Sequence, residues 1–470
     1  MCVCEHSQFL NLTCFRYFHP EQQAGPSVVN EFNTFPQVVP QVQDTDLNPA
    51  TYDQLPLFDP NRPRFPHPNR MRYLGPMFFD HVGLYFPFLD RFDVLRRIEH
   101  RTCSAILSNC IAGLAIRFAN FSHPNVAAGS PFYDMAKTLA SHVVSVPSVE
   151  ALHALICITW AEYGSGHDDG FWMYSRMAIA MCLDLGLGNE ATIQLAATPE
   201  VRHRLRLTWW MVVSTADIAA SWATGRPATL DLDHYDTKLP EVTDDLSLLF
   251  QNIAALFVLR GKLSRVLDAH VENQGGTSLD WGLSELQVEV ENISKALPST
   301  MVFNKENLAC ICNRRIGHLF VQMHILIHAV SALVNRPSLL PSYGLPVPTE
   351  GPRVDAARSC AKSLADILLT VENVAPQTLR DPFMDLSILV ACRVLMADGD
   401  AQITTIGVPA SPSSTLLAGQ WKDTFMDTCK KSLVRVSASW GGGTTFDSIL
   451  ERHGGGLLID DLQFSVSSCK

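Results

Sequence analysis

The chain has 470 residues, a formal net charge of −11 and a hydrophobic fraction of 47%. This composition is that of a globular protein with a large core, and it excludes a chain that is disordered throughout. It also excludes a general basic surface, so we do not expect the body of the chain to bind nucleic acid through clustered Lys and Arg side chains.

Residues 1–74 are rich in Pro, Gln and Asn, and we expect them to form a disordered segment or one that orders only on contact. The opening residues show neither a basic region nor a long apolar run, so no signal peptide is visible. Many of the 13 cysteines lie in apolar helical patterns, where a reduced thiol behaves as a small hydrophobic group. These features favour a reducing compartment, the cytosol or the nucleus.

From residue 75 onward, apolar residues recur at the three- and four-residue steps of helices. A first clear helix opens at Pro147 and ends at Gly164, and a second covers residues 169–185. A third begins after Thr198, which is followed by Pro and Glu as at a capped helix start. Further helices are predicted at residues 246–271, 283–297, 305–334, 353–374 and 381–397.

Convincing strands with period two are absent, so the pattern predicts an all-α fold of packed helix pairs over residues 75–400. We expect a loop-rich tail over residues 401–470. The uncharged run at residues 316–335 contains Gln322 and three histidines. It falls short of a membrane span, and we interpret it as a buried helix of a protein with no membrane partner.

Two helical motifs resemble known sites but lack required residues. His324 and His328 lie four residues apart, as paired metal ligands do, yet Ile325 occupies the position where a zincin needs its Glu base. Gly261 and Lys262 resemble part of a phosphate loop, but the flanking Gly and Ser or Thr of that loop are absent. We therefore favour core or interface histidines and an ordinary helix.

Other short motifs also fail as sites. Residues 164–166 read Gly-Ser-Gly, without the spacing or the preceding strand of a nucleophile elbow. Trp440 is followed by three glycines, which predicts a flexible loop. We therefore expect no catalytic residues, no metal site and no enzyme activity, although some cysteines have unusual spacings: Cys2, Cys4 and Cys14, which His6 or His19 would complete on paper, and Cys310 with Cys312.

The most distinctive stretch is residues 202–240, which we interpret as one amphipathic helix, a Gly-Arg-Pro stop and an acidic loop that closes on Leu-Pro. A Trp pair on a helix anchors a core, and Asp217 near the same face could pair with an Arg such as Arg226. None of these residues is arranged for acid–base or nucleophilic chemistry. We expect an architectural role for Trp209, Trp210, Asp217, Gly225, Arg226, Pro227, Leu239 and Pro240.

Four blocks of the chain, taken in order, resemble the fungal-specific transcription factor domain, the middle homology region of fungal zinc-cluster regulators. The blocks begin at Phe79, Trp172, Arg202 and Met323 and cover about residues 75–400. The third block, with its Trp pair and Gly-Arg-Pro, is the most specific. In the fourth, Met323 and Asn335 replace the family's usual Tyr and His, and Arg336 and Pro337 match its signature.

The resemblance implies a nuclear transcription regulator whose partners are DNA and coactivator or co-regulator proteins, and whose signature residues hold the fold. Two stretches of acidic and apolar residues, 44–59 and 446–464, would suit activation segments that dock on coactivator grooves. A solvated tail with one docked helix is the alternative for the second stretch.

The chain departs from the family at its N-terminal end. Members typically open with a six-cysteine binuclear zinc cluster, whereas residues 1–70 hold three cysteines and few basic residues. We therefore expect zinc as a cofactor only with an N-terminal cluster that this sequence does not show. The family implies DNA binding, but these residues argue against direct, sequence-specific DNA contact by this chain. A ligand- or protein-binding scaffold or co-regulator derived from such a factor remains the alternative. A homodimer stays open, although no heptad run predicts a coiled coil.

Overall fold

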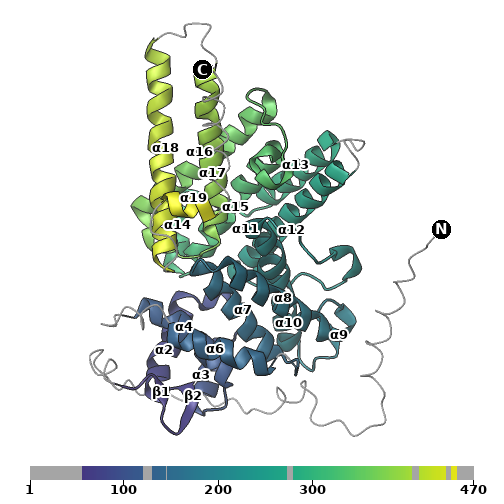
Figure 1. The fold of residues 1–470 in the computed structure, drawn as a ribbon, viewed down its shortest axis with the longest axis vertical. Helices are drawn as coiled ribbons and strands as arrows, with labels where there is room; N and C mark the ends of the chain where they lie inside the picture. Colours follow the sequence, from purple (N-terminus) through teal and green to yellow (C-terminus); the bar gives the residue numbers. More distant parts are fainter. Residues whose placement is uncertain are drawn as a thin grey trace, which may run out of the picture. The chain divides into compact units, whose positions relative to one another are not determined.

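The computed structural model describes residues 55–119, 130–143, 145–272, 279–404, 412–440 and 446–452 (Figure 1). The predicted all-α fold is confirmed: helices make up nearly all the regular structure of these residues. The described strands are β1 (Phe58–Asp59) and β2 (Arg62–Pro66), which pair antiparallel. All described residues lie in one unit, residues 46–470.

The first half of the chain forms a succession of short and medium helices. Thr198 caps α10, because its side chain accepts a hydrogen bond from the Val201 amide at 3.3 Å. Gly186, at φ +68°, supplies the left-handed residue that follows α8. The helices are α2 (Pro68–His81), α3 (Arg91–Glu99), α4 (Ala105–Ala115), α6 (Ser130–Val143), α7 (Val149–Gly164), α8 (Asp168–Asp184), α9 (Glu190–Gln194) and α10 (Pro199–Met211).

The helix predicted in the 202–240 stretch continues beyond α10 with a changed geometry. Residues Val212–Ala219 form η5, a π-helical segment, and α11 (Ala220–Thr224) completes the run. Gly225 then adopts φ +67°, a left-handed conformation that Gly takes without steric cost. The Gly-Arg-Pro stop is therefore found where the sequence predicts it, whereas the π segment is not visible in the pattern.

The second half consists of longer helices. The predicted helix over 305–334 is wrong in one respect: it breaks into α14 and α15, with Arg315 at φ +63° between them. The helices are α12 (Asp245–Glu272), α13 (Leu279–Lys295), α14 (Lys305–Asn313), α15 (Gly317–Asn335), α16 (Pro352–Val374), α17 (Met384–Thr404), α18 (Pro412–Ala438) and α19 (Phe446–Arg452).

Short 3-10 turns connect many of these helices. They are η3 (Gly83–Tyr85), η4 (Ile116–Phe118), η6 (Leu232–His234), η7 (Ser299–Met301), η8 (Pro337–Leu339), η9 (Pro341–Tyr343) and η10 (Pro376–Thr378).

Two expectations at the ends of the chain need correction. Residues 55–74, expected within the disordered segment, form the β-hairpin and the start of α2, because the Phe58 ring packs 5.4 Å from Phe132 and the Asn109 side chain donates to the Arg64 carbonyl at 2.8 Å. In the tail expected to be loop-rich, α18 lies beside α17 (Figure 1). Residues 1–54 and 453–470 lie outside the described part.

Trp440, predicted in a flexible loop, is instead part of the core. It is 1% exposed, and its ring lies 6.4 Å from the Trp160 ring. Its indole N–H donates to the Arg380 carbonyl at 2.6 Å. Burial of so much aromatic area is strongly stabilising and holds this side chain in the core. The three glycines that follow it lie outside the described residues.

Helix α15 lies at the centre of the second half and packs against α12, α13, α16 and α17. Two described helices, α12 and α15, are long and apolar enough to cross a membrane by length and composition. The apolar window of α15 is 89% buried inside the structure, in agreement with its interpretation as a core helix.

Candidate functional site

Asp217 joins the π segment to the loop after Gly-Arg-Pro. Its carboxylate is 1% exposed and accepts hydrogen bonds from the Thr229 amide at 2.8 Å, the Thr229 hydroxyl at 3.0 Å and the Leu230 amide at 3.1 Å. An ion pair with Arg176 of α8 at 3.3 Å completes its environment. One carboxylate therefore holds the loop, the π segment and α8 together.

Asp217 does pair with an Arg, but the residue is Arg176 and not the predicted Arg226. Arg226 is exposed and pairs with Asp169 at 3.0 Å, because the left-handed turn at Gly225 directs the chain away and brings Thr229 back to the helix. Arg176 and Arg226 both lie over the Trp172 ring, at 3.7 and 5.2 Å from its centroid. Burial lowers the pKa of Arg176.

Trp209 and Trp210 both contact the acidic loop that follows Gly-Arg-Pro. Trp209 is buried and lies 5.0 Å from the Tyr235 ring, and a Cβ at Gly188 would come within 2.9 Å of its indole. Trp210 donates its indole N–H to the Lys238 carbonyl at 2.9 Å. Leu239 is 38% exposed, whereas Pro240 is buried.

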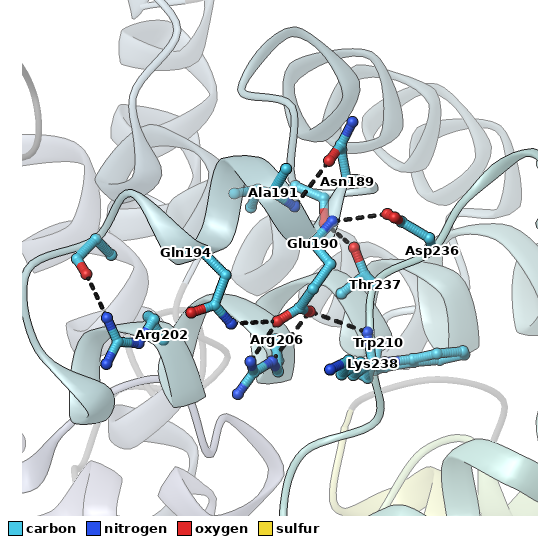
Figure 2. Close-up of polar contacts among 12 residues, drawn as sticks. Asn189, Glu190, Ala191, Gln194, Arg202, Arg206, Trp210, Asp236, Thr237 and Lys238 are labelled. Carbon is cyan, nitrogen blue, oxygen red and sulfur yellow. Dashed lines mark hydrogen bonds and ion pairs between the residues drawn. The ribbon is translucent and has the colours of Figure 1, made fainter.

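Glu190, which no sequence motif marks, is the centre of this loop contact (Figure 2). Its carboxylate forms a two-bonded ion pair with Arg206 and accepts from the Lys238 amide at 3.1 Å. Its own amide donates to the Asp236 carboxylate at 2.7 Å. The hydrogen bonds from Arg206 lower the pKa of Glu190 to about 2, against the opposing effect of burial.

The remaining signature pair lies after α15. Arg336 is 1% exposed and donates to the Pro348 carbonyl at 3.0 Å, and Pro337 begins η8. The structure thus places Trp209, Trp210 and Asp217 within the continuous helical run from α10 to α11, and the other signature residues on the turns and loops that follow helices. Their architectural role stays a prediction.

A cavity of about 660 Å³ lies between the loop after α11, α12, the segment after α15 and α17. The signature residues Asp217, Gly225, Arg226 and Pro227 line it, whereas Trp209, Trp210, Leu239 and Pro240 do not. Its volume lies within the range of small-molecule pockets.

Most charged side chains on the cavity wall are paired. Asp168 pairs with Arg452 at 2.6 Å and Asp231 with Arg265 at 3.4 Å. Arg260 is different: it is 5% exposed, and it forms no ion pair with any carboxylate of the described residues. Burial lowers its pKa to about 10.

The motifs weighed for chemistry have structural explanations. The ring Nε2 of His324 donates to the Met301 carbonyl at 2.9 Å. A Cβ at Gly261 would lie 3.2 Å from Ile218, so this glycine allows α12 to approach the π segment. Lys262 pairs with Glu289 at 2.7 Å. Among the described residues, no group of three or more His, Cys, Asp or Glu could hold a metal ion, and Cys2, Cys4 and Cys14 lie outside them.

The fold defines an all-α domain in which two buried carboxylates, Asp217 and Glu190, hold the loops near a cavity. Residues 76–257 match the family model of the fungal specific transcription factor domain. The match runs from within α2 to within α12 and includes Asp217, Glu190 and the loop residues that they bind.

One curated relative supports the match. The chain is 26% identical over 126 residues to the nitrogen assimilation transcription factor nirA of Emericella nidulans. The similar region covers 25% of this chain and 14% of that protein. No solved structure matches this chain. The family resemblance inferred from the sequence is therefore confirmed, and it concerns a domain rather than a whole relative.

Proposed function

We propose that this chain is a fungal transcription regulator that acts in the nucleus, and that its helical body is the regulatory domain of that factor. The family match over residues 76–257 carries the proposal. The similarity to nirA supports it, since that protein is by its name a transcription factor. Both likenesses are to regulators and not to enzymes, which favours a regulatory role.

The helical body itself is a poor DNA ligand. The chain carries a formal charge of −11, and phosphate contact needs clustered cations. We propose that the protein reaches promoters through an N-terminal zinc cluster that this sequence does not show, or through a DNA-binding partner. Coactivators or co-regulators are the protein partners that this role requires.

The activation segment expected in the tail, residues 446–464, cannot include its first residues. Ile449 and Leu450 of α19 are buried, and Arg452 donates to the Tyr163 carbonyl at 2.9 Å. Residues 446–452 therefore form a docked helix of the body. The remaining acidic and apolar residues are 453–464, which include Asp460 and Asp461. We propose that activation, where present, resides there.

The test uses the full chain, tagged for localisation and separately fused to a heterologous DNA-binding domain at a reporter promoter. We expect nuclear localisation and changed reporter output. A stop codon after Arg452 should lower the output of an activator while leaving thermal unfolding unchanged, and Asp460→Asn with Asp461→Asn should lower it in part. A cytoplasmic protein that does not change reporter output would contradict the proposal.

The second candidate is a co-regulator or scaffold that binds no DNA, which the acidic charge of the chain favours. Chromatin immunoprecipitation of the full chain separates the two. Occupancy that persists after removal of every co-purifying DNA-binding partner supports direct binding. Occupancy that disappears with one partner supports the co-regulator.

A further inference from the structure

The guanidinium of Arg260, on the cavity wall, is incompletely satisfied. Arg260 donates through Nη1 to the Ser264 hydroxyl at 2.5 Å, and its Cζ lies 5.2 Å from the Trp222 ring centroid. Its Nε has no hydrogen-bond partner among the residues that the structure describes. A buried cation without a carboxylate is costly, so the arrangement favours an anion that completes it.

Other groups near Arg260 do not supply that anion. Asp268 lines the same cavity and raises the pKa of Arg260, against the larger effect of burial, but the two do not form an ion pair. The hydroxyl of Tyr343 donates to the Ser264 carbonyl at 3.4 Å, and the residue lines the cavity. Neither side chain therefore forms an ion pair with Arg260, which itself lines the cavity.

A second guanidinium comes from α17. Arg393 is 7% exposed, lines the cavity and donates to the Leu339 carbonyl at 3.4 Å. Burial lowers its pKa. Leu386 precedes it by two helical turns and Leu389 by one, so they lie on the same face of α17. The cavity thus combines two buried cations with an apolar wall.

We propose that this cavity binds a small organic anion with one carboxylate and an apolar body, and that Arg260 holds the carboxylate. The planar fork of Arg matches a carboxylate through two parallel hydrogen bonds. Leu386, Leu389 and Trp222 would contact the apolar part. A single negative charge fits best because Asp268 and Glu451 also line the cavity and repel further charge.

The inferred ligand binding does not depend on the proposed role in transcription. It is therefore measured on the isolated full chain without DNA. The probes are 4-fluorobenzoate and hexanoate, with 4-fluorobenzamide as the neutral isostere and inorganic phosphate as a non-carboxylate anion. Fluorine NMR of the two fluorinated probes reports binding, and competition by hexanoate and phosphate reports on the others.

We expect saturable binding of 4-fluorobenzoate that hexanoate displaces, and binding of the amide weaker by about tenfold or more, or about 1.4 kcal/mol. Arg260→Met should weaken carboxylate binding by a similar factor, and Arg260→Lys should weaken it less. Arg265→Met is the matched control: this side chain lines the same cavity but is paired with Asp231, so carboxylate binding should persist.

Folding of the variants is checked by thermal unfolding without ligand. Arg260→Met should unfold at the same temperature as the parent chain or higher, because it removes a buried charge that has no partner. Equal binding of amide and carboxylate, unchanged binding in Arg260→Met, stronger competition by phosphate than by hexanoate, or no saturable binding of either carboxylate would each overturn the proposal. A large loss of stability in Arg260→Met would also overturn it, since that variant would then have lost an internal partner.

Discussion

Single buried carboxylates fix the loops of this domain. Asp217 accepts three hydrogen bonds from Thr229 and Leu230 and pairs with Arg176, and Glu190 pairs with Arg206 while accepting from the Lys238 amide. Backbone amides in a buried loop need acceptors, and a carboxylate can satisfy several of them at once. The loops before and after His234 are thereby attached to the helices at two separate points.

Replacement of Asp217 by Asn tests the first clamp. The amide retains one acceptor oxygen but loses the charge that neutralises Arg176, so a partly buried cation is left without its carboxylate. We expect a loss of about 3 kcal/mol in the free energy of unfolding, measured by urea denaturation. Asp233→Asn is the control, because the Asp233 side chain is 87% exposed. A loss no larger than in the control would contradict the clamp.

The second clamp predicts a dependence on pH. Because Arg206 lowers the pKa of Glu190 to about 2 in the folded chain, the carboxylate stabilises the fold above its unfolded pKa of about 4.5. This contribution is lost as the pH falls from about 4.5 to about 2. Glu190→Gln should remove that part of the acid dependence, measured by thermal unfolding between these pH values.

Glu285→Gln is the matched control for the acid titration, because Glu285 is exposed on α13. It should keep the same slope of stability against pH as the parent chain. If Glu190→Gln and the control gave parallel profiles, the contribution of Glu190 would be absent.

At the scale of elements, the π segment η5 decides what faces the cavity. A π turn inserts an extra residue into a helix and shifts the residues after it around the axis. Asp217 and Ile218 lie in this segment, and Ile218 packs against Gly261 of α12. The segment therefore positions both the clamp carboxylate and one wall of the cavity.

Gly164, the last residue of α7, packs against Trp440, which follows α18, and this contact gives a further test. A Cβ at Gly164 would lie 2.4 Å from the Trp440 ring, which is too close unless one element moves. Gly164→Ala should cost about 1–3 kcal/mol of stability through overpacking, measured by urea denaturation.

A double-mutant cycle tests whether Trp440 causes the loss of stability in Gly164→Ala. In the background of Trp440→Leu, the smaller side chain leaves room, so the added methyl should cost about 1 kcal/mol less than it does in the parent chain. Equal costs in the two backgrounds would show that another contact limits the site.

At the scale of the whole molecule, the matched domain shares its core with residues outside the match. The Tyr163 ring stacks on Phe383 at 4.4 Å, and its hydroxyl donates to Asp385 at 2.5 Å. Arg452 of α19 pairs with Asp168 of α8 at 2.6 Å. The matched residues 76–257 therefore bury side chains against helices that follow them in the sequence.

This sharing predicts how fragments behave. A fragment of residues 76–257 should fail to fold cooperatively, because Tyr163 and the apolar face of α12 would be exposed to water. A fragment of residues 55–452 should unfold cooperatively, near the temperature of the full chain. Near-ultraviolet circular dichroism during heating measures both, and a cooperative transition in the shorter fragment would show that the match is a self-contained domain.

Much of the fold follows from local sequence alone. Thr198 and Pro199 mark a helix start because a side-chain acceptor and a fixed φ suit the first turn, and Gly225 marks an end because only Gly adopts its φ freely. The same signals do not reveal the π segment, the break at Arg315 or the helix α18, since packing overrides weak local preferences there.

The sequence by itself determined the class of fold, most helix boundaries and the family signature, because periodicity, caps and stops act within a few residues. Only the tertiary structure decided which charges meet. Arg176 rather than Arg226 pairs with Asp217, and Glu190 and Arg260 gain their surroundings from segments up to 48 and 83 residues away, Lys238 and Tyr343. Electrostatic pairing depends on distance in space and on burial, and the local sequence pattern determines neither of them.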